Sequence, residues 1–506
     1  MSVKSRMAMG CAILVTTASL AACGETSPVQ QAEVSVNEGS SPMRLTIAIP
    51  QVGDIPDKGN EIEQLIEKYT HTKLDFQWIP NAAYTDKINV IIASNEMPKL
   101  LRAESTPTII GAIQTGLFWE LGPFLKDYKN LSAQNTQYYE NVSVNGKIFG
   151  IPNFREMGRA AFIYRKDWMD NLGLQQPKSI DEWYEVLKAL TLNDPDRNGK
   201  NDTFGMVLYK KYNEGQASLF TRMGVSLGAP NKWSIEKGSF VPEFMSKEYN
   251  EMLKLFRRLY SEKLINQDFA VFDLSEAEKL YDSGRVGIRV AVAQNAKSQQ
   301  DRLSKTDPKS IVDVEPMRGV QGIRVAGETG NNGFYVIPKS SVKTEEEVRK
   351  VLTFLDQMMD PPMATLLLRG IENKHYVKSG DKTEYLNFTA FQREVKPYRD
   401  NLPQIEGYHV AELKDTLLGE KSQKIAENNF QYLVPNPALN LWSQTYSEHG
   451  KNLEQIIWDA QTKFIMGKID EAGWKAEIEK WMQAGGSRIM EEYKADYNKL
   501  ENKPYN

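Results

Sequence analysis

The segment DPDRNGKND, from Asp194 to Asp202, places oxygen-bearing side chains at alternate positions. Hard cations such as Ca²⁺ bind several oxygen ligands, and a tight loop turns alternate side chains inward. Numbered as an EF-hand-type loop, the segment begins at Asp194 and has Gly199 at its sixth position. The expected calcium ligands are Asp194, Asp196, Asn198, the backbone carbonyl of Lys200, and Asp202.

The loop departs from a complete EF-hand at its twelfth position, where Gly205 stands in place of the bidentate Glu. Turns rich in Asp, Asn and Gly also form without metal, because these side chains bond to their own backbone. The segment therefore predicts a structural Ca²⁺ site, with a solvated turn as the alternative.

Cys23 is a second residue with chemical potential, and it follows Leu20–Ala22. Upstream lie Lys4, Arg6 and an apolar run from Met7 to Val15, which is the pattern of a secretory signal. This run is too short for a bilayer span of about 20 residues. The cysteine and the three residues before it resemble the lipobox of bacterial lipoproteins, which implies cleavage before the cysteine and acylation of its sulfur. An ordinary signal peptide with a chance cysteine is the alternative.

We therefore expect residues 1–22 to be a lipoprotein signal peptide. Acyl chains such as palmitate on Cys23 would then anchor the protein on the extracytoplasmic face of the cell membrane. Residues 23–43 are rich in Ser, Gln, Glu and Gly and contain no aromatic side chain, so they are expected to form a flexible tether.

Length and charge limit the remaining possibilities. A chain of 506 residues exceeds what one hydrophobic core serves, so we expect two or three domains. Loss of the signal removes Lys4 and Arg6 and takes the formal net charge from −4 to −6, which argues against a nucleic-acid partner. The cysteines Cys11 and Cys23 lie in the signal and at the acylation site, so the mature protein should contain no disulfide.

Enzyme motifs do not occur in the sequence. It contains no G-x-S-x-G, P-loop, G-x-G-x-x-G or H-E-x-x-H. The four histidines are far apart and show no ligand spacing: His71, His375, His409 and His449. We expect no catalysis, although a carboxylate pair for glycoside cleavage remains open among 66 acidic residues.

The elements that position these residues follow from hydrophobic periodicity. Residues 44–49 and 74–78 alternate as strands do, helical spacing covers 61–69 and 84–94, and 99–103 predicts a further short strand. This alternation predicts an α/β domain with a largely parallel sheet. Between 452 and 497 the spacing is amphipathic, and we expect its Trp and Met side chains in a core rather than at a partner surface.

Three stretches carry a resemblance to a known family. They are NGKIFGIPNFREMGRAAFIYRKDWMDNLGL at 145–174, YDSGRVGI at 281–288 and GETGNNGFYVIPKSS at 327–341. The chain resembles family 1 extracellular solute-binding proteins, which capture substrates for carbohydrate ABC importers. GIENKHY at 370–376 resembles the LplA-like lipoprotein branch. The resemblance implies an α/β, two-lobed periplasmic-binding-protein-like fold of type II with a hinged cleft, and a calcium loop like the one above.

The resemblance also implies boundaries and a binding site. The N-terminal lobe would comprise residues 44–153 and 334–395, and the C-terminal lobe 154–333 and 396–506. Sugar sites stack aromatic faces on the ring and bond its hydroxyls with planar polar groups. The loops placed at the cleft nominate as ligand-binding residues Asn153, Arg155, Tyr164, Trp233, Gln294, Asn295, Glu328, Asn331, Asn332 and Trp119.

The function expected from these features is capture of an oligosaccharide or modified sugar and its delivery to the permease subunits of an ABC transporter. The binding protein itself would act as a monomer and cleave nothing. Two alternatives stay open: a lipid-anchored extracellular glycan-processing enzyme, and a ligand-sensing lobe for a signalling partner.

Overall fold

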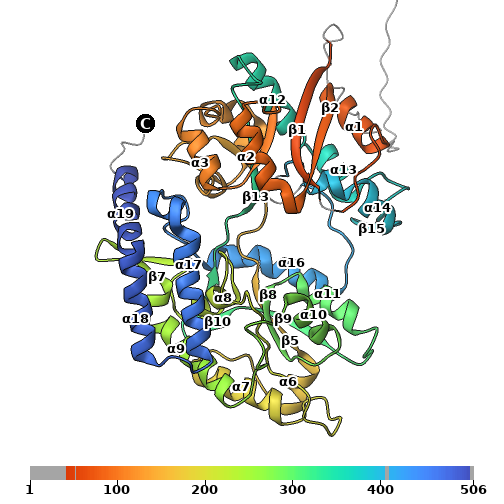
Figure 1. Ribbon diagram of the computed structural model, residues 1–506. Helices are drawn as coiled ribbons and strands as arrows, with labels where there is room; N and C mark the ends of the chain where they lie inside the picture. The colour runs from red at the N-terminus through yellow and green to blue at the C-terminus, as the bar shows by residue number, and fades with distance from the viewer. Residues whose placement is uncertain (1–40, 52, 405–408, 502–506) are drawn as a thin grey trace, which may run out of the picture. The chain divides into compact units, whose positions relative to one another are not determined.

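The computed structural model describes residues 41–51, 53–404 and 409–501 (Figure 1). The predicted signal peptide, Cys23 and the predicted tether up to residue 40 lie outside the described residues. From Pro42 on, the chain belongs to one compact unit. No helix in the described part is long and apolar enough to span a bilayer.

The first half of the chain contains the following elements: β1 (Met43–Gln51), α1 (Glu61–Thr70), β2 (Thr72–Pro80), α2 (Tyr84–Ser94), β3 (Leu100–Ala103), α3 (Pro107–Gln114), α4 (Lys129–Ala133), α5 (Thr136–Glu140), β4 (Gly150–Phe154), β5 (Ala160–Arg165), α6 (Lys166–Leu172), α7 (Ile180–Leu192), α8 (Leu219–Ser226), β6 (Trp233–Glu236), β7 (Ser239–Pro242) and α9 (Lys247–Ser261).

The second half continues with α10 (Leu274–Asp282), β8 (Ile288–Val292), α11 (Asn295–Leu303), β9 (Val312–Pro316), β10 (Arg318–Gly319), β11 (Gly322–Ile323), β12 (Val325–Ala326), β13 (Asn331–Val336), α12 (Glu345–Gln357), α13 (Pro361–Arg369), β14 (Tyr376–Ser379), β15 (Lys382–Tyr385), α14 (Phe388–Glu394), α15 (Lys396–Arg399), α16 (Leu417–Asn428), β16 (Leu433–Val434), α17 (Gln444–Ile465), α18 (Glu471–Trp481) and α19 (Ser487–Glu501).

The first sheet has the strand order β2-β1-β3-β13-β4. The β1 strand pairs in parallel with both β2 and β3, as the alternation of strands and helices predicts. The β13 strand is antiparallel to β3 and β4, so the expected parallel arrangement covers only part of the sheet. This difference arises because the chain leaves the first sheet along β4 and returns to it along β13, so these neighbouring strands run in opposite directions.

Both faces of the first sheet are covered by helices. Leu45, Ile47 and Ile49 pack in one core with residues of α1, α12 and α13, whereas Ala48 packs in another with residues of α2 and α3. This division follows from the strand period of two, which points successive side chains to opposite faces of the sheet. Figure 1 shows α1 and α13 on one side of β1 and β2, and α2 and α3 on the other.

A second sheet has the order β8-β5-β9 and is antiparallel throughout. Phe162 of β5 packs on one face with residues of α7, α9 and α17, and Ile163 packs on the other with residues of α11. The C-terminal helices contribute Trp474 and Trp481, which are buried in the core that contains Phe162. Trp474 and Trp481 of the amphipathic segment between 452 and 497 thus lie in a core, as expected.

Candidate functional site

Two crossover strands, β4 and β13, lie beside each other where the chain passes between the two sheets. Asn331 pairs with Phe154, and the Arg155 N–H donates to the Gly330 carbonyl at 3.0 Å. The register shifts just after Asn331. There Gly333 has a φ of 81°, and a Cβ at this position would lie 2.7 Å from a backbone oxygen of β3. Only glycine fits such a left-handed, closely packed position.

A cavity of about 630 Å³ adjoins these crossover strands, and we call it the aromatic pocket. Its aromatic lining comes from β6, from the segment that leads into α17 and from several helices: Trp233, Phe244, Tyr249, Trp442, Tyr446, Trp458, Trp481 and Tyr493. Asn331 and Asn332 line it from β13, and Glu104 and Thr106 line it from the end of β3 and the start of α3. Aromatic faces beside a few polar groups are typical of small-molecule sites.

The charged groups deep in this pocket are largely compensated. Lys232 Nζ lies 3.1 Å from Glu243 Oε1, with side chains only 18% and 8% exposed. The Tyr446 hydroxyl donates to Glu454 Oε1 at 2.9 Å. Burial is the main cause that raises the pKa of Glu454, so the pocket favours its neutral form.

A second cavity of about 650 Å³ also adjoins the crossover and is here called the charged pocket. It shares Arg155 and Asn332 with the aromatic pocket. Asn153 and Gln294, two predicted ligand residues, line only the charged pocket. The nominated side chains are thus distributed over two cavities, of which the aromatic pocket also contains Trp233 and Asn331.

The side chain of Glu328, another nominated residue, is 9% exposed and forms ion pairs with two arginines. Arg159 contacts its Oε2, and Arg222 Nη2 donates to its Oε1 at 2.8 Å. Burial raises the pKa of this carboxyl, but the charges and hydrogen bonds of Arg222 and Arg159 outweigh it and leave the pKa below its usual value. The structure therefore gives Glu328 an internal ion-pair role.

The remaining nominated residues line neither of these two cavities. The Tyr164 hydroxyl donates to Asp313 at 3.3 Å, and Trp119 Nε1 donates to the Val342 carbonyl at 2.9 Å. Asn295 lines a separate, open hollow at the start of α11.

Of the aromatic residues of the aromatic pocket, sequence reasoning nominated Trp233 alone and missed Phe244, Tyr249, Trp442, Tyr446, Trp458, Trp481 and Tyr493. Trp458 falls in the segment whose tryptophans were expected in a core. Trp474 and Trp481 do lie in that core, and Trp481 also borders the cavity. Of these residues, Trp442 could have been recognised from the sequence, because it follows the proline-containing stretch PNPALN and precedes the helix α17.

The loop predicted to bind calcium folds tightly on itself. Asp194 and Gly199 have φ values of 46° and 75°, and the carboxylate of Asp194 accepts the backbone N–H groups of Asn198 and Gly199, each at 3.0 Å. The Asn198 amide nitrogen donates to Asp196 at 2.8 Å and to Asp202 at 3.3 Å. Four of the predicted ligand side chains thus converge.

This donor set fits a hard cation in its chemistry, because carboxylate and amide oxygens are the ligands that Ca²⁺ prefers. Burial first, then a hydrogen bond from Asp194, raises the pKa of Asp196, as expected where carboxylates crowd together. Over the described ranges, no group of three His, Cys, Asp or Glu side chains is arranged around a common metal position. The Asn198 amide nitrogen instead bridges two of the carboxylates.

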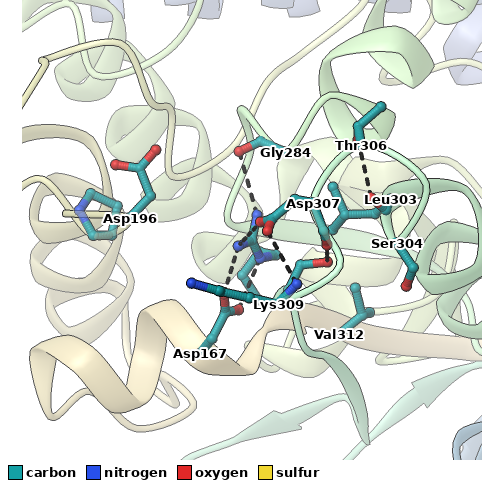
Figure 2. Close-up of polar contacts among 12 residues, drawn as sticks. Asp167, Asp196, Gly284, Leu303, Ser304, Thr306, Asp307, Lys309 and Val312 are labelled. Carbon is teal, nitrogen blue, oxygen red and sulfur yellow. Dashed lines mark hydrogen bonds and ion pairs between the residues drawn. The ribbon is translucent and has the colours of Figure 1, made fainter. Parts of the chain in front are cut away.

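A neighbouring polar cluster is structural. The Arg165 guanidinium, 3% exposed, pairs with Asp167 at 2.6 Å and Asp307 at 3.2 Å and lies 4.5 Å above the Trp168 ring. Figure 2 shows Asp167, Gly284 and Asp307 gathered there, with Asp196 to one side. The cluster holds the junction of β5 and α6. It does not include Asp196, whose carboxylate accepts a hydrogen bond from Asn198 within its own loop.

Comparisons with known proteins agree with this architecture. Residues 53–357 match the family described as bacterial extracellular solute-binding protein. Lipoprotein LipO of Bacillus subtilis (strain 168) is 38% identical over 459 residues, which are 88% of this chain and 89% of LipO. The polygalacturonan/rhamnogalacturonan-binding protein YtcQ of the same strain is 34% identical over 454 residues, again 88% and 89% of the two chains.

Solved structures share the fold at lower identity. An HMO-binding, ABC-transporter-associated solute-binding protein of Bifidobacterium longum infantis superposes with a TM-score of 0.72 at 16% identity, covering 92% of this chain and all of that one. FusA of S. pneumoniae in complex with kestose superposes with a TM-score of 0.65 at 18% identity, covering 90% of this chain and 99% of FusA. These neighbours are two-lobed. The chain therefore belongs to the family of bacterial extracellular solute-binding proteins.

Proposed function

We propose that the protein captures an oligosaccharide in the aromatic pocket and delivers it unchanged to the permease of an ABC importer. The observation that carries this proposal is the pocket's lining, in which Trp233, Trp442 and Trp458 face the same cavity as Asn331 and Asn332. Indole faces stack on sugar rings, and amides bond to hydroxyl groups. The names of YtcQ and of the fructooligosaccharide transporter protein FusA support the same class of ligand.

Capture would work by closure of two lobes. Thr106 lines the aromatic pocket from the first sheet's elements, and Trp458 lines it from α17. A ligand that contacts both lobes favours the closed state, whereas a ligand that contacts a single lobe would not shift the equilibrium between the open and closed states.

We place the second boundary of the N-terminal lobe after Leu402 rather than at 395, because Tyr398 and Leu402 pack in the core of the first sheet.

Four of the nominated residues remain our proposed ligand contacts: Arg155, Trp233, Asn331 and Asn332. We add Trp442, Tyr446 and Trp458. We further propose that Cys23 is acylated and holds a monomer on the extracytoplasmic face of the membrane. The family consists of binding proteins, and we propose that this member likewise makes and breaks no bond.

The test is a thermal-shift and calorimetric screen of oligosaccharides, with chromatography of the recovered ligand. Trp442→Ala should weaken binding about 30-fold, because truncating a buried aromatic anchor costs about 2 kcal/mol. The control is Phe388→Ala, since Phe388 is an aromatic residue that is 50% exposed and lines neither pocket. Ligand recovered as shorter fragments would establish an enzyme instead, and equal losses in both variants would contradict the assignment of the pocket.

We also infer that the 194–202 loop holds a structural Ca²⁺. The ligands would be Asp194, Asp196, Asn198 with its amide turned, the Lys200 carbonyl and Asp202; amide orientation is not fixed by atom positions alone. A solved FusA variant is described as an EF-hand mutant, which supports such a loop in relatives. Calcium should raise the melting temperature of the wild-type protein and not that of Asp196→Ala. Melting that a chelator leaves unchanged would contradict the inference.

A further inference from the structure

Arg155 differs from the other charged residues of the aromatic pocket. Lys232 and Glu243 neutralise each other, and Glu454 is held by the Tyr446 hydroxyl. Glu104 is exposed and therefore hydrated. Arg155 is half-buried at the crossover, and its pKa is lowered mainly by desolvation and then by the charge of Arg159.

The guanidinium of Arg155 has no acceptor among the described residues. Within residues 41–51, 53–404 and 409–501, no side chain or carbonyl forms a hydrogen bond or ion pair with it, and its backbone N–H alone is bonded, to Gly330. Five N–H donors in a planar fork are thus available at a surface shared by two cavities.

The nearby carboxylate cannot supply the missing partner. Both oxygens of Glu328 are already taken by Arg159 and Arg222. Arg102 adds further positive charge, because its guanidinium bonds, among the described residues, to neutral acceptors alone, including the Asn332 carbonyl at 2.9 Å and Asn401 Oδ1 at 2.7 Å. Glu156 acts on Arg155 through its charge but forms no hydrogen bond or ion pair with it among the described residues. Four arginines, Arg102, Arg155, Arg159 and Arg222, therefore outnumber the carboxylates of Glu328 and Glu156 at the crossover. A half-buried unpaired cation is costly unless an anion joins it.

We propose that Arg155 is an anion subsite and that the captured oligosaccharide carries an acidic group, a carboxylate or a sulfate ester, at the sugar that reaches the crossover. This proposal deepens the proposed function and depends on it. The fork geometry suits two parallel hydrogen bonds to a carboxylate or to two sulfate oxygens. The tryptophans would stack on the rings, and Arg155 would select the charge.

The experiment measures binding of three matched trisaccharides by calorimetry: tri-galacturonate, a sulfated galactose trisaccharide and neutral galactotriose. The protein is compared with Arg155→Gln, Arg155→Lys and the control Lys424→Gln. Lys424 is an exposed cation that lines only the charged pocket. Circular-dichroism melting checks that each variant is folded.

The wild type should bind at least one acidic probe about 30-fold more tightly than galactotriose, since leaving one member of a buried charged pair unpaired costs upwards of 2 kcal/mol. Arg155→Gln should abolish that preference, Arg155→Lys should retain part of it, and Lys424→Gln should leave it intact. The carboxylate and sulfate arms identify which anion fits.

The proposal is overturned if galactotriose binds as tightly as both acidic probes, if neither acidic probe binds, or if the preference survives Arg155→Gln. Loss of the preference in Lys424→Gln alone would also overturn it, because the anion would then lie in the charged pocket. Neutral binding that depends on Trp442 would leave the proposed function standing while this inference fails.

Discussion

Replacement of Glu328 by Gln tests how much the crossover depends on this buried carboxylate. The Glu328→Gln change would keep the shape of the side chain but would remove the charge that holds Arg159 and Arg222. The three side chains are 9%, 19% and 12% exposed, so solvent compensates little. Removing one partner of a buried ion pair lowers the free energy of unfolding by about 3–5 kcal/mol. Gln is a neutral side chain of the same shape, so the loss in Glu328→Gln should lie near the lower value.

A loss of about 3 kcal/mol corresponds to a fall in melting temperature of roughly 6–12 °C, at 2–4 °C per kcal/mol for domains of 150–250 residues. Circular dichroism on the mature protein at pH 7 measures it. The matched control is Glu251→Gln, whose carboxylate is 46% exposed and lies 3.4 Å from Lys254, and this change should cost about 0.5 kcal/mol. If the two variants melt together, the reasoning is wrong.

The same variant predicts a pH dependence. The folded-state pKa of Glu328 lies below its usual value, so its contribution is present above the unfolded-state pKa of about 4.3 and is lost as pH falls through the folded-state pKa. The gap in melting temperature between wild type and Glu328→Gln should therefore narrow below about pH 4.3. A gap of constant size from neutral to acidic pH would contradict the charge argument.

Two further changes test separate features. Burial raises the pKa of Glu454, so ionisation of this carboxyl destabilises the fold as pH rises above about 4.3. The Glu454→Gln variant should therefore be more stable than wild type at pH 7 but not at pH 4. The control variant Glu448→Gln, at a side chain that is 53% exposed, should gain no stability at pH 7. Ser179→Ala removes a capping box on α7 and should cost about 1 kcal/mol by chemical denaturation, whereas Ser132→Ala, at an exposed position, should cost much less.

The elements of the first sheet were predictable because their signal is local. Alternation at 44–49 and 74–78 corresponds to β1 and β2, and the helical spacing at 61–69 and 84–94 corresponds to α1 and α2 within one residue. Ser179 and Glu182 form a capping box at the start of α7, and Gly173 ends α6 with a φ of 64°. Each of these features depends on residues a few positions apart.

The site was less predictable because its partners are remote in sequence. Glu328 contacts Arg159 and Arg222 across 169 and 106 residues, so its ion pairs leave no local pattern. Trp458 and Trp474 share one amphipathic stretch, yet the first lines a pocket and the second is buried against Asn250, to which its Nε1 donates at 2.7 Å. Helical periodicity does not distinguish these two outcomes.

The position of β13 has a consequence for biosynthesis. Phe334 must pair with both Ala103 and Pro152, so the first sheet lacks an interior strand until residue 336 has left the ribosome. Contacts this distant along the chain slow folding, because a long loop must close before they form. A nascent chain shorter than this leaves the edges of β3 and β4 unpaired, and edges of that kind are where chaperones or a secretion machinery can hold a chain open.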